Sequence, residues 1–239
     1  MIRNVFLDYK ATFKERWDYA WRFGNAGRFC SMFGAAIVVA RDGGNGIPIF
    51  TYLFLLIIST LISATCMPYL SKPMFLCPMD RQERKQYLRS YYLLNMGFTA
   101  SIYIIIFGAL LLFRQVDIIE FLMVCIGYMA LMAISNIKIV CRSNKHKDLW
   151  HFGTWKKVSF LLTMLSNVIV IMVFGDTGLG LGEMIAIGIF TALALFFCCY
   201  MVIRFLPVML EVNSVYEQCD RKFYDLELRK ITKFEEIDW

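Results

Sequence analysis

The chain has 239 residues, of which 59% are hydrophobic, and its formal net charge is +6. A soluble domain is usually about 45–50% apolar, and the excess here is gathered in separate runs, which is typical of a protein that crosses a membrane several times. The Lys and Arg residues lie between those runs and not on one basic face, so the composition argues against nucleic-acid binding.

Residues 1–27 are expected to hold an amphipathic helix over residues 2–22. Its apolar and aromatic residues recur at three- and four-residue spacing: Ile2, Val5, Phe6, Tyr9, Phe13, Trp17 and Trp21. We expect this helix to lie in the membrane interface, to pack on a cytoplasmic partner, or to do both. Charged and aromatic residues are mixed here without an early apolar core, which predicts that there is no cleavable signal peptide.

Residues 28–207 are predicted to form six membrane spans, over residues 29–40, 49–67, 93–113, 118–140, 158–174 and 183–206. The first is short for a hydrocarbon core that needs about 20 residues. Lys138, near the end of the fourth, is placed to reach toward the polar surface. Short turns follow the first, third and fifth spans, and longer polar loops follow the second and fourth.

Residues 208–239 form a mixed-charge tail that is predicted to be a cytoplasmic amphipathic helix. Its apolar residues again have helical spacing: Val212, Val215, Tyr216, Cys219, Phe223 and Leu226. No linker divides residues 1–239, so the fold class expected is a single all-α membrane domain with six transmembrane helices, an interfacial N-terminal helix and a cytoplasmic C-terminal helix.

The distribution of basic residues predicts the orientation. All of the 25 Lys and Arg residues except Arg41 and Arg114 lie in the N-terminal segment, the two long loops or the tail, with Lys138 and Arg204 counted at span ends. By the positive-inside rule both termini are cytoplasmic, and the chain is expected in the plasma membrane.

The loop between the second and third spans is cationic, with Asp80 and Glu83 among its basic residues, which are Lys72, Arg81, Arg84, Lys85 and Arg89. Pro73 and Pro78 interrupt its first part, whereas nothing breaks a helix from Asp80 onward, and Asp80 is a reasonable N-cap. A short helix within a cationic loop is therefore predicted.

No catalytic constellation is found in the sequence. It contains no G-x-x-x-x-G-K-[ST], H-E-x-x-H or G-x-S-x-G motif, so we expect no enzymatic activity of its own and no nucleotide bound by a phosphate loop. The eight cysteines form no C-x-x-C pair and suit buried free thiols, and His146 and His151 do not match a metal-ligand pattern. No metal site or cofactor of this chain is expected.

Polar residues inside the predicted spans are mild, and almost no carboxylate lies away from a span end. The missing carboxylates count against proton or sodium coupling. The hydroxyl and amide side chains either join helices by hydrogen bonds or line a cavity. The candidate cavity-lining residues are Ser59, Ser63, Thr99, Thr163 and Asn167, of which Asn167 is the best because it lies near the middle of the fifth span.

Six spans, cytoplasmic termini, very short outer loops and a charged helix between the second and third spans together resemble a permease subunit of an ABC exporter. The segment Cys77-Pro78-Met79-Asp80-Arg81-Gln82-Glu83-Arg84-Lys85-Gln86-Tyr87 is similar to the proline-led, Arg- and Lys-rich loop of many six-span bacterial permeases. The resemblance in layout covers nearly the whole chain.

This resemblance implies that two permease subunits, identical or paralogous, form a translocation path, and that separate ABC ATPase subunits bind ATP and Mg²⁺. It implies that the 2–22 helix is a connector and that the segment after Pro78 is a coupling helix docked on the ATPase. The coupling residues implied are Pro78, Asp80, Arg81, Glu83, Arg84 and Arg89. Export of a peptide, a lipid or another amphipathic molecule is expected.

Two alternatives remain open from the residues themselves. One is a membrane enzyme or assembly factor, and the other is a secondary carrier, each acting without an ATPase partner. In either case the basic loop would carry solvated topology charges that touch anionic membrane lipids.

Overall fold

The computed structural model describes residues 5–12, 14, 52–53, 70, 72–76, 78–114, 118–141, 152–175 and 181–219. The first predicted span, all of the second except Tyr52 and Leu53, most of the predicted 2–22 helix and the tail beyond residue 219 lie outside these residues. All regular secondary structure in the described ranges is helical. The predicted all-α class is therefore confirmed for this part of the chain.

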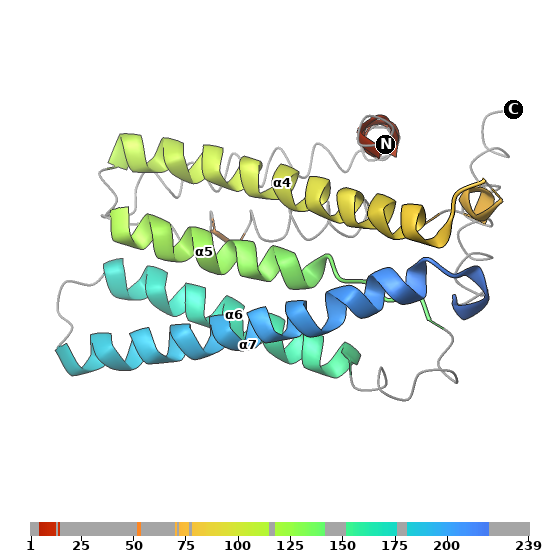
Figure 1. Cartoon of the computed structure of the whole chain (residues 1–239). Helices are drawn as coiled ribbons and strands as arrows, with labels where there is room; N and C mark the ends of the chain where they lie inside the picture. The colour runs from red at the N-terminus through yellow and green to blue at the C-terminus, as the bar shows by residue number, and fades with distance from the viewer. Residues whose placement is uncertain are drawn as a thin grey trace, which may run out of the picture.

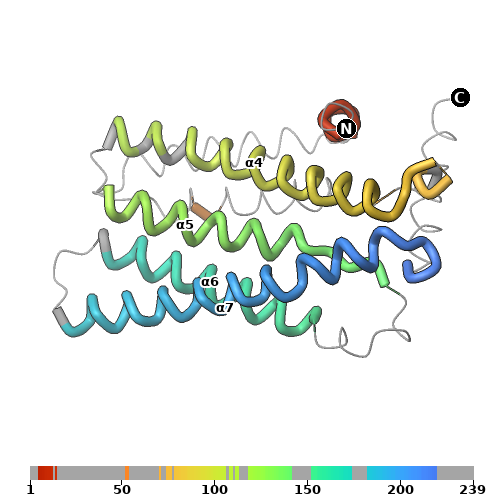
Figure 2. The backbone as a smooth tube through the Cα atoms, viewed as in Figure 1, coloured from red at the N-terminus to blue at the C-terminus, as the bar shows by residue number. Residues whose placement is uncertain are grey.

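Four long helices form a bundle of antiparallel neighbours, shown in Figure 1 and as a tube in Figure 2. They are α4 (Arg81–Arg114), α5 (Ile118–Ser135), α6 (Phe152–Gly175) and α7 (Leu181–Asn213). Two short 3-10 helices, η1 (Lys72–Phe75) and η3 (Tyr216–Gln218), lie at the end of the bundle where α4 begins and α7 ends. Residues 5–12 form a further helix, seen end-on beside α4.

Three helices of the described part are long and apolar enough to cross a membrane: Ile118–Ser135, Phe152–Val173 and Gly182–Asn213. They correspond to the fourth, fifth and sixth predicted spans. Helix α4, which contains the third predicted span, is not among them. The structure thus supports three spans where the sequence led us to expect six, and the first two lie outside the described ranges, Tyr52 and Leu53 aside.

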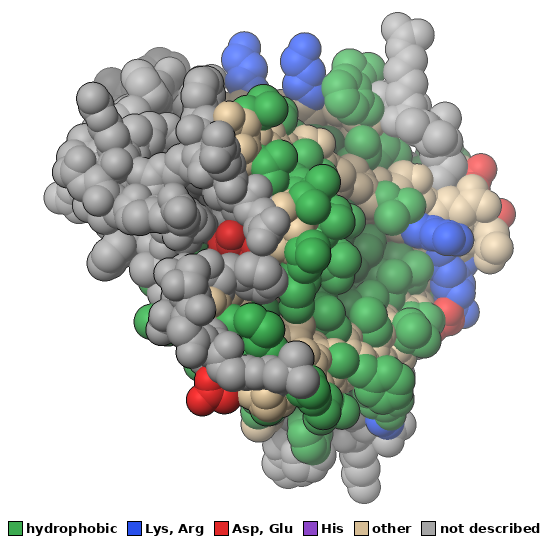
Figure 3. Space-filling view, turned by 90° about the vertical axis from the view of Figure 1, so that its left-hand side faces the viewer, with side chains coloured by type: hydrophobic (Ala, Val, Ile, Leu, Met, Phe, Trp, Pro, Cys, Tyr) green, Lys and Arg blue, Asp and Glu red, His purple; other side chains and the backbone are tan. Residues whose placement is uncertain are grey.

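The core of the bundle is aromatic as well as aliphatic. Tyr103 of α4 stacks on Tyr128 of α5 with ring centroids 3.6 Å apart, and Leu131 and Met132 of α5 are buried beside them. Many other large apolar side chains point outward, such as Phe196, which is 73% exposed. In the end-on view of Figure 3, hydrophobic side chains occupy much of the described surface on that face, and the exposed large apolar side chains include many of α5, α6 and α7. An apolar exterior of this extent suits contact with lipid.

The helix boundaries differ from the predicted ones at the polar end of the bundle. The predicted short helix after Asp80 is not separate: it forms the first turns of the continuous 34-residue helix α4, because nothing between Arg81 and Arg114 breaks the helix. Helix α5 ends at Ser135 instead of residue 140, and its last turn is tightened by a bond from the Ile137 amide to the Ile134 carbonyl at 3.2 Å. Lys138 is therefore outside the helix.

The last two helices are longer than predicted. Helix α6 begins at Phe152, six residues before the predicted span, and takes in Lys156. Helix α7 continues through Pro207 to Asn213, although a proline inside a helix removes one backbone hydrogen bond. A turn then precedes η3, so the single amphipathic helix predicted for the tail is interrupted after Asn213, and its continuation beyond residue 219 is not described.

Candidate functional site

The polar end of the bundle begins with a capped helix start. The Glu83 amide donates a hydrogen bond to Asp80 Oδ1 at 2.6 Å, and the Asp80 amide donates one to Glu83 Oε2 at 3.1 Å. This reciprocal pair is a capping box, which satisfies two backbone donors and also places carboxylates at the positive end of the helix dipole. The predicted N-cap at Asp80 is confirmed.

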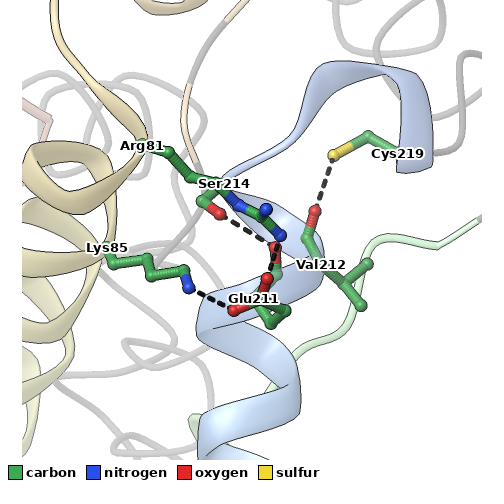
Figure 4. Close-up of polar contacts among 6 residues, drawn as sticks. All are labelled: Arg81, Lys85, Glu211, Val212, Ser214 and Cys219. Atoms are coloured by element: carbon green, nitrogen blue, oxygen red, sulfur yellow. Dashed lines mark hydrogen bonds and ion pairs between the residues drawn. The ribbon is translucent and has the colours of Figure 1, made fainter.

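Helix α4 is fastened to the end of α7 by one carboxylate. The guanidinium of Arg81 and the ammonium of Lys85, one turn apart on α4, both form ion pairs with Glu211 of α7 (Figure 4). The Ser214 hydroxyl donates to the Glu211 carbonyl at 2.8 Å. Because these side chains are partly exposed, each pair contributes at most about 1 kcal/mol. Their main effect is to fix the geometry of the two helix ends.

The other predicted coupling residues have different surroundings. The Arg84 guanidinium lies 5.7 Å from the ring centroid of Phe75 and its Nε donates to the Asp80 carbonyl at 3.4 Å, so it holds η1 against α4. Pro78 and Arg89 are exposed, and the structure shows no hydrogen bond or ion pair for Arg89 within the described ranges. Between η1 and Pro78, Leu76 is 87% exposed.

The helix over residues 5–12 packs across α4. Tyr9 is buried, its ring meets that of Tyr91 edge-on at 5.3 Å, and its hydroxyl donates to Asn95 Oδ1 at 3.0 Å. Asn95 Nδ2 then donates to Asn136 Oδ1 at 2.7 Å, just beyond α5. One chain of hydrogen bonds therefore connects three segments that are distant in sequence.

The hydroxyl of Tyr87 makes a second contact to this helix by donating to a carboxylate oxygen of Asp8. Burial, then the hydrogen bond to Asp8 and then the negative charge of Asp8 raise the pKa of Tyr87 well above its ordinary value. The phenol thus stays protonated and keeps donating throughout the physiological pH range.

Two polar side chains join further backbone segments at the same end of the bundle. Lys156 Nζ donates to the carbonyl of Ser135, at 3.0 Å, and to that of Ile137, which caps the C-terminus of α5. Asn213 Oδ1 accepts from the Val140 amide at 3.0 Å, and its Nδ2 donates to the Lys138 carbonyl at 2.8 Å. The polar end is thereby a hydrogen-bonded layer and not a set of independent loops.

The candidate cavity residues are packed inside the bundle. Thr99 and Thr163 are buried, and their hydroxyls donate to the carbonyls of Asn95 and Ser159, each at 2.9 Å. Asn167 Nδ2 donates to the Tyr52 hydroxyl at 2.8 Å. Within the described part of the chain, no hydrogen bond joins these three side chains to one another. Ser59 and Ser63 lie outside the described ranges. Their role in a translocation path between two subunits stays a prediction.

Sequence reasoning missed several contributors. Glu211, Lys156 and Asn213 gave no local signal, because their partners are 19 to 130 residues away in the chain. Glu120 is buried in the first turn of α5, where the helix dipole favours its charge. The sequence did offer one signal for Glu120, because it is a carboxylate at the third position of an apolar run.

Comparisons with known proteins give no counterpart: no family model, no curated sequence and no solved structure matches this chain. Among the described residues, no group of three or more His, Cys, Asp and Glu side chains is placed to hold a metal ion. The feature that remains is the hydrogen-bonded polar end of an otherwise apolar bundle. Its exposed tip consists of residues 76 and 78–83, from Leu76 to the first turn of α4.

Proposed function

We propose that this chain is the permease subunit of an ATP-driven ABC transporter, and that residues 72–89 dock on a separate ATPase subunit. The observation that supports the proposal is the continuity of α4. The helix begins at the exposed tip beside Leu76 and runs without a break into the bundle. A displacement of the tip is therefore transmitted directly to the predicted third span.

The composition of the tip suits a protein partner. A single exposed leucine is ordinary on a protein surface, but Leu76 lies beyond the apolar part of the bundle, next to exposed Pro78 and the exposed charges of Arg81 and Glu83. An apolar contact surrounded by charges of both signs is the usual composition of a protein interface with a polar rim.

The surrounding contacts suit transmission of force. Glu211 holds the start of α4 to the end of α7, while the Tyr9–Asn95–Asn136 chain holds it to the N-terminal helix and to α5. On this proposal, closure of the ATPase dimer around ATP moves the start of α4, and the bundle follows as one body. Two permease subunits with six spans each enclose the path for an exported peptide, lipid or other amphipathic molecule.

The polar end is cytoplasmic on this proposal, in accordance with the positive-inside rule. Arg81, Lys85, Arg89, Lys138, Lys156 and Arg204 lie toward this end of α4 to α7, whereas Glu120 and Glu183 lie in the first turns at the other end. Lipid contact alone would also use these cations, but it gives no role to an exposed leucine in a polar loop.

The test is purification of the tagged chain from its host in mild detergent, with mass spectrometry of the proteins that accompany it. We expect a stoichiometric ATPase with the wild-type chain and its loss with Leu76→Glu. The matched control is Glu217→Gln, an exposed residue of η3 at the same end, which should retain the ATPase. A wild-type chain that carries no ATPase, under conditions that preserve known transporter complexes, would overturn the proposal.

A further inference from the structure

A pocket of about 320 Å³ opens between the start of α6 and residues 197–205 of α7. A methionine and five aromatic side chains line it, and Arg204 lies among them; the aromatic residues are Phe152, Trp155, Phe197, Tyr200 and Phe205. The rings of Phe152 and Phe205 are 4.6 Å apart, and Trp155 meets Phe197 edge-on at 5.9 Å. The pocket is therefore built across two helices.

The cation in this pocket is positioned but not neutralised. Arg204 Nη1 donates to the Tyr200 hydroxyl at 2.9 Å, and its guanidinium lies 6.0 and 5.6 Å from the ring centroids of Tyr200 and Phe205. Arg204 is exposed, and it forms no ion pair with a carboxylate of the described residues. Its remaining N–H donors have no hydrogen-bond partner among the described residues and can meet an anion.

The position of the pocket relative to the membrane surface follows from the charged residues of α7. No charged residue lies between Glu183 and Arg204, and 21 residue steps at 1.5 Å correspond to about 31 Å. A hydrocarbon core is about 30 Å thick. With Glu183 at one membrane surface, Arg204 lies at the other, and Trp155 takes the interfacial position that tryptophan favours.

From this geometry we propose that the pocket binds an anionic glycerophospholipid. Its phosphate meets Arg204 and one acyl chain lies among the aromatic side chains. Free inorganic phosphate would leave the aromatic lining unused, and a phosphocholine headgroup would bring a second cation close to the guanidinium. The surface of α7 beside the pocket is apolar, with Ile203 74% exposed, so the opening faces lipid and not water. The inference needs α6 and α7 to be embedded in a membrane, but it does not need an ATPase partner.

Trp155 is a built-in reporter for the test. In a variant whose other tryptophans, Trp17, Trp21, Trp150 and Trp239, are replaced by Phe, the tryptophan emission, excited selectively over tyrosine, comes from the pocket alone. This variant is reconstituted in phosphatidylcholine vesicles with the same mole fraction of either brominated phosphatidylglycerol or brominated phosphatidylcholine. We expect an about fivefold preference for the anionic quencher, the factor that one basic side chain at a membrane surface provides.

Variants of Arg204 distinguish specific binding of an anionic lipid in the pocket from general contact of Trp155 with lipid. Arg204→Gln should reduce the preference to about that of bulk lipid, and Arg204→Lys should retain part of it. Lys10→Gln, at an exposed cation of the helix over residues 5–12, should leave the preference unchanged. Because Arg204 is exposed, the variants should fold, and their helix content by circular dichroism checks this. Equal quenching by the two lipids in the wild-type pocket, or an anionic preference that survives Arg204→Gln, would overturn the proposal.

Discussion

Gly127 of α5 leaves the space that the side chain of Asn167 of α6 occupies. A Cβ at position 127 would overlap Asn167 Oδ1 and lie 2.6 Å from its Cγ. This close approach holds Asn167 where its Nδ2 reaches the hydroxyl of Tyr52, which is buried in the core of the bundle. Asn167 therefore joins helices by close packing and a hydrogen bond, and its predicted role in lining a cavity stays a prediction.

Replacement of Gly127 by alanine should destabilise the bundle by about 1–3 kcal/mol, the usual cost of overpacking a filled core. Thermal unfolding in detergent measures it. Gly188→Ala is the matched control, because an added Cβ there meets nothing within 4 Å. Alanine should be neutral or slightly stabilising at position 188, since it favours a helix interior over glycine. Equal effects of the two substitutions would contradict the packing of Asn167 against α5.

Asn95→Leu should release the N-terminal helix. The substitution removes the hydrogen bonds that Asn95 makes with the Tyr9 hydroxyl and with Asn136 Oδ1. Loss of a buried hydrogen-bond partner costs about 1–3 kcal/mol. Limited proteolysis should then cut within residues 5–12 at much lower protease concentration than in the wild type. Ser101→Ala is the control on the same helix, because the exposed Ser101 hydroxyl donates only to the carbonyl of Gly97 among the contacts described. Unchanged protection of residues 5–12 in Asn95→Leu would refute this link.

Glu211→Gln should weaken the connection between α4 and α7 by about 0.5–2 kcal/mol in total, since two partly exposed ion pairs are lost. The deficit should shrink in 1 M salt, where the screening length falls to about 3 Å. Unfolding at low and high salt provides the comparison, and Glu217→Gln serves again as the control. A deficit that is insensitive to salt would mean that Glu211 acts through packing instead of charge.

Tyr87 gives a prediction for pH. Because its pKa is raised in the folded chain, the neutral phenol is favoured by folding, so its contribution is complete below the unfolded pKa of about 10 and is lost as the pH rises beyond it. The difference in stability between the wild type and Tyr87→Phe should therefore be constant from about pH 6 to 9 and decrease above about 10. Thermal unfolding across this range is the measurement, and a difference that changes between pH 6 and 9 would exclude this role.

The predictable part of this fold is the part with a local signal. Apolar runs located α5, α6 and α7, and Asp80 as an N-cap residue located the start of α4. The boundaries failed where the chain passes from polar to apolar composition inside one helix, as it does near Tyr92 in α4 and Lys157 in α6. A membrane surface is not a helix boundary, because the backbone hydrogen bonds continue on both sides of it.

The site was less accessible to sequence reasoning than the fold. The charged residues of the tip could be identified, but not that Arg81 and Lys85 are held by Glu211. The aromatic residues around Arg204 come from two helices, and each alone is indistinguishable from ordinary span composition. Only the packing of α6 on α7 makes a pocket of them.

The cap that Lys156 places on α5 has a consequence for the order of assembly. The Ser135 and Ile137 carbonyls meet their ammonium donor only after the chain has been made through the first turn of α6. The Val140 amide and the Lys138 carbonyl can form their hydrogen bonds only later, when Asn213 at the end of α7 has been made. We therefore expect the fourth predicted span to enter the bilayer together with the fifth, as a hairpin, and the polar end to close only when the ribosome has passed residue 213.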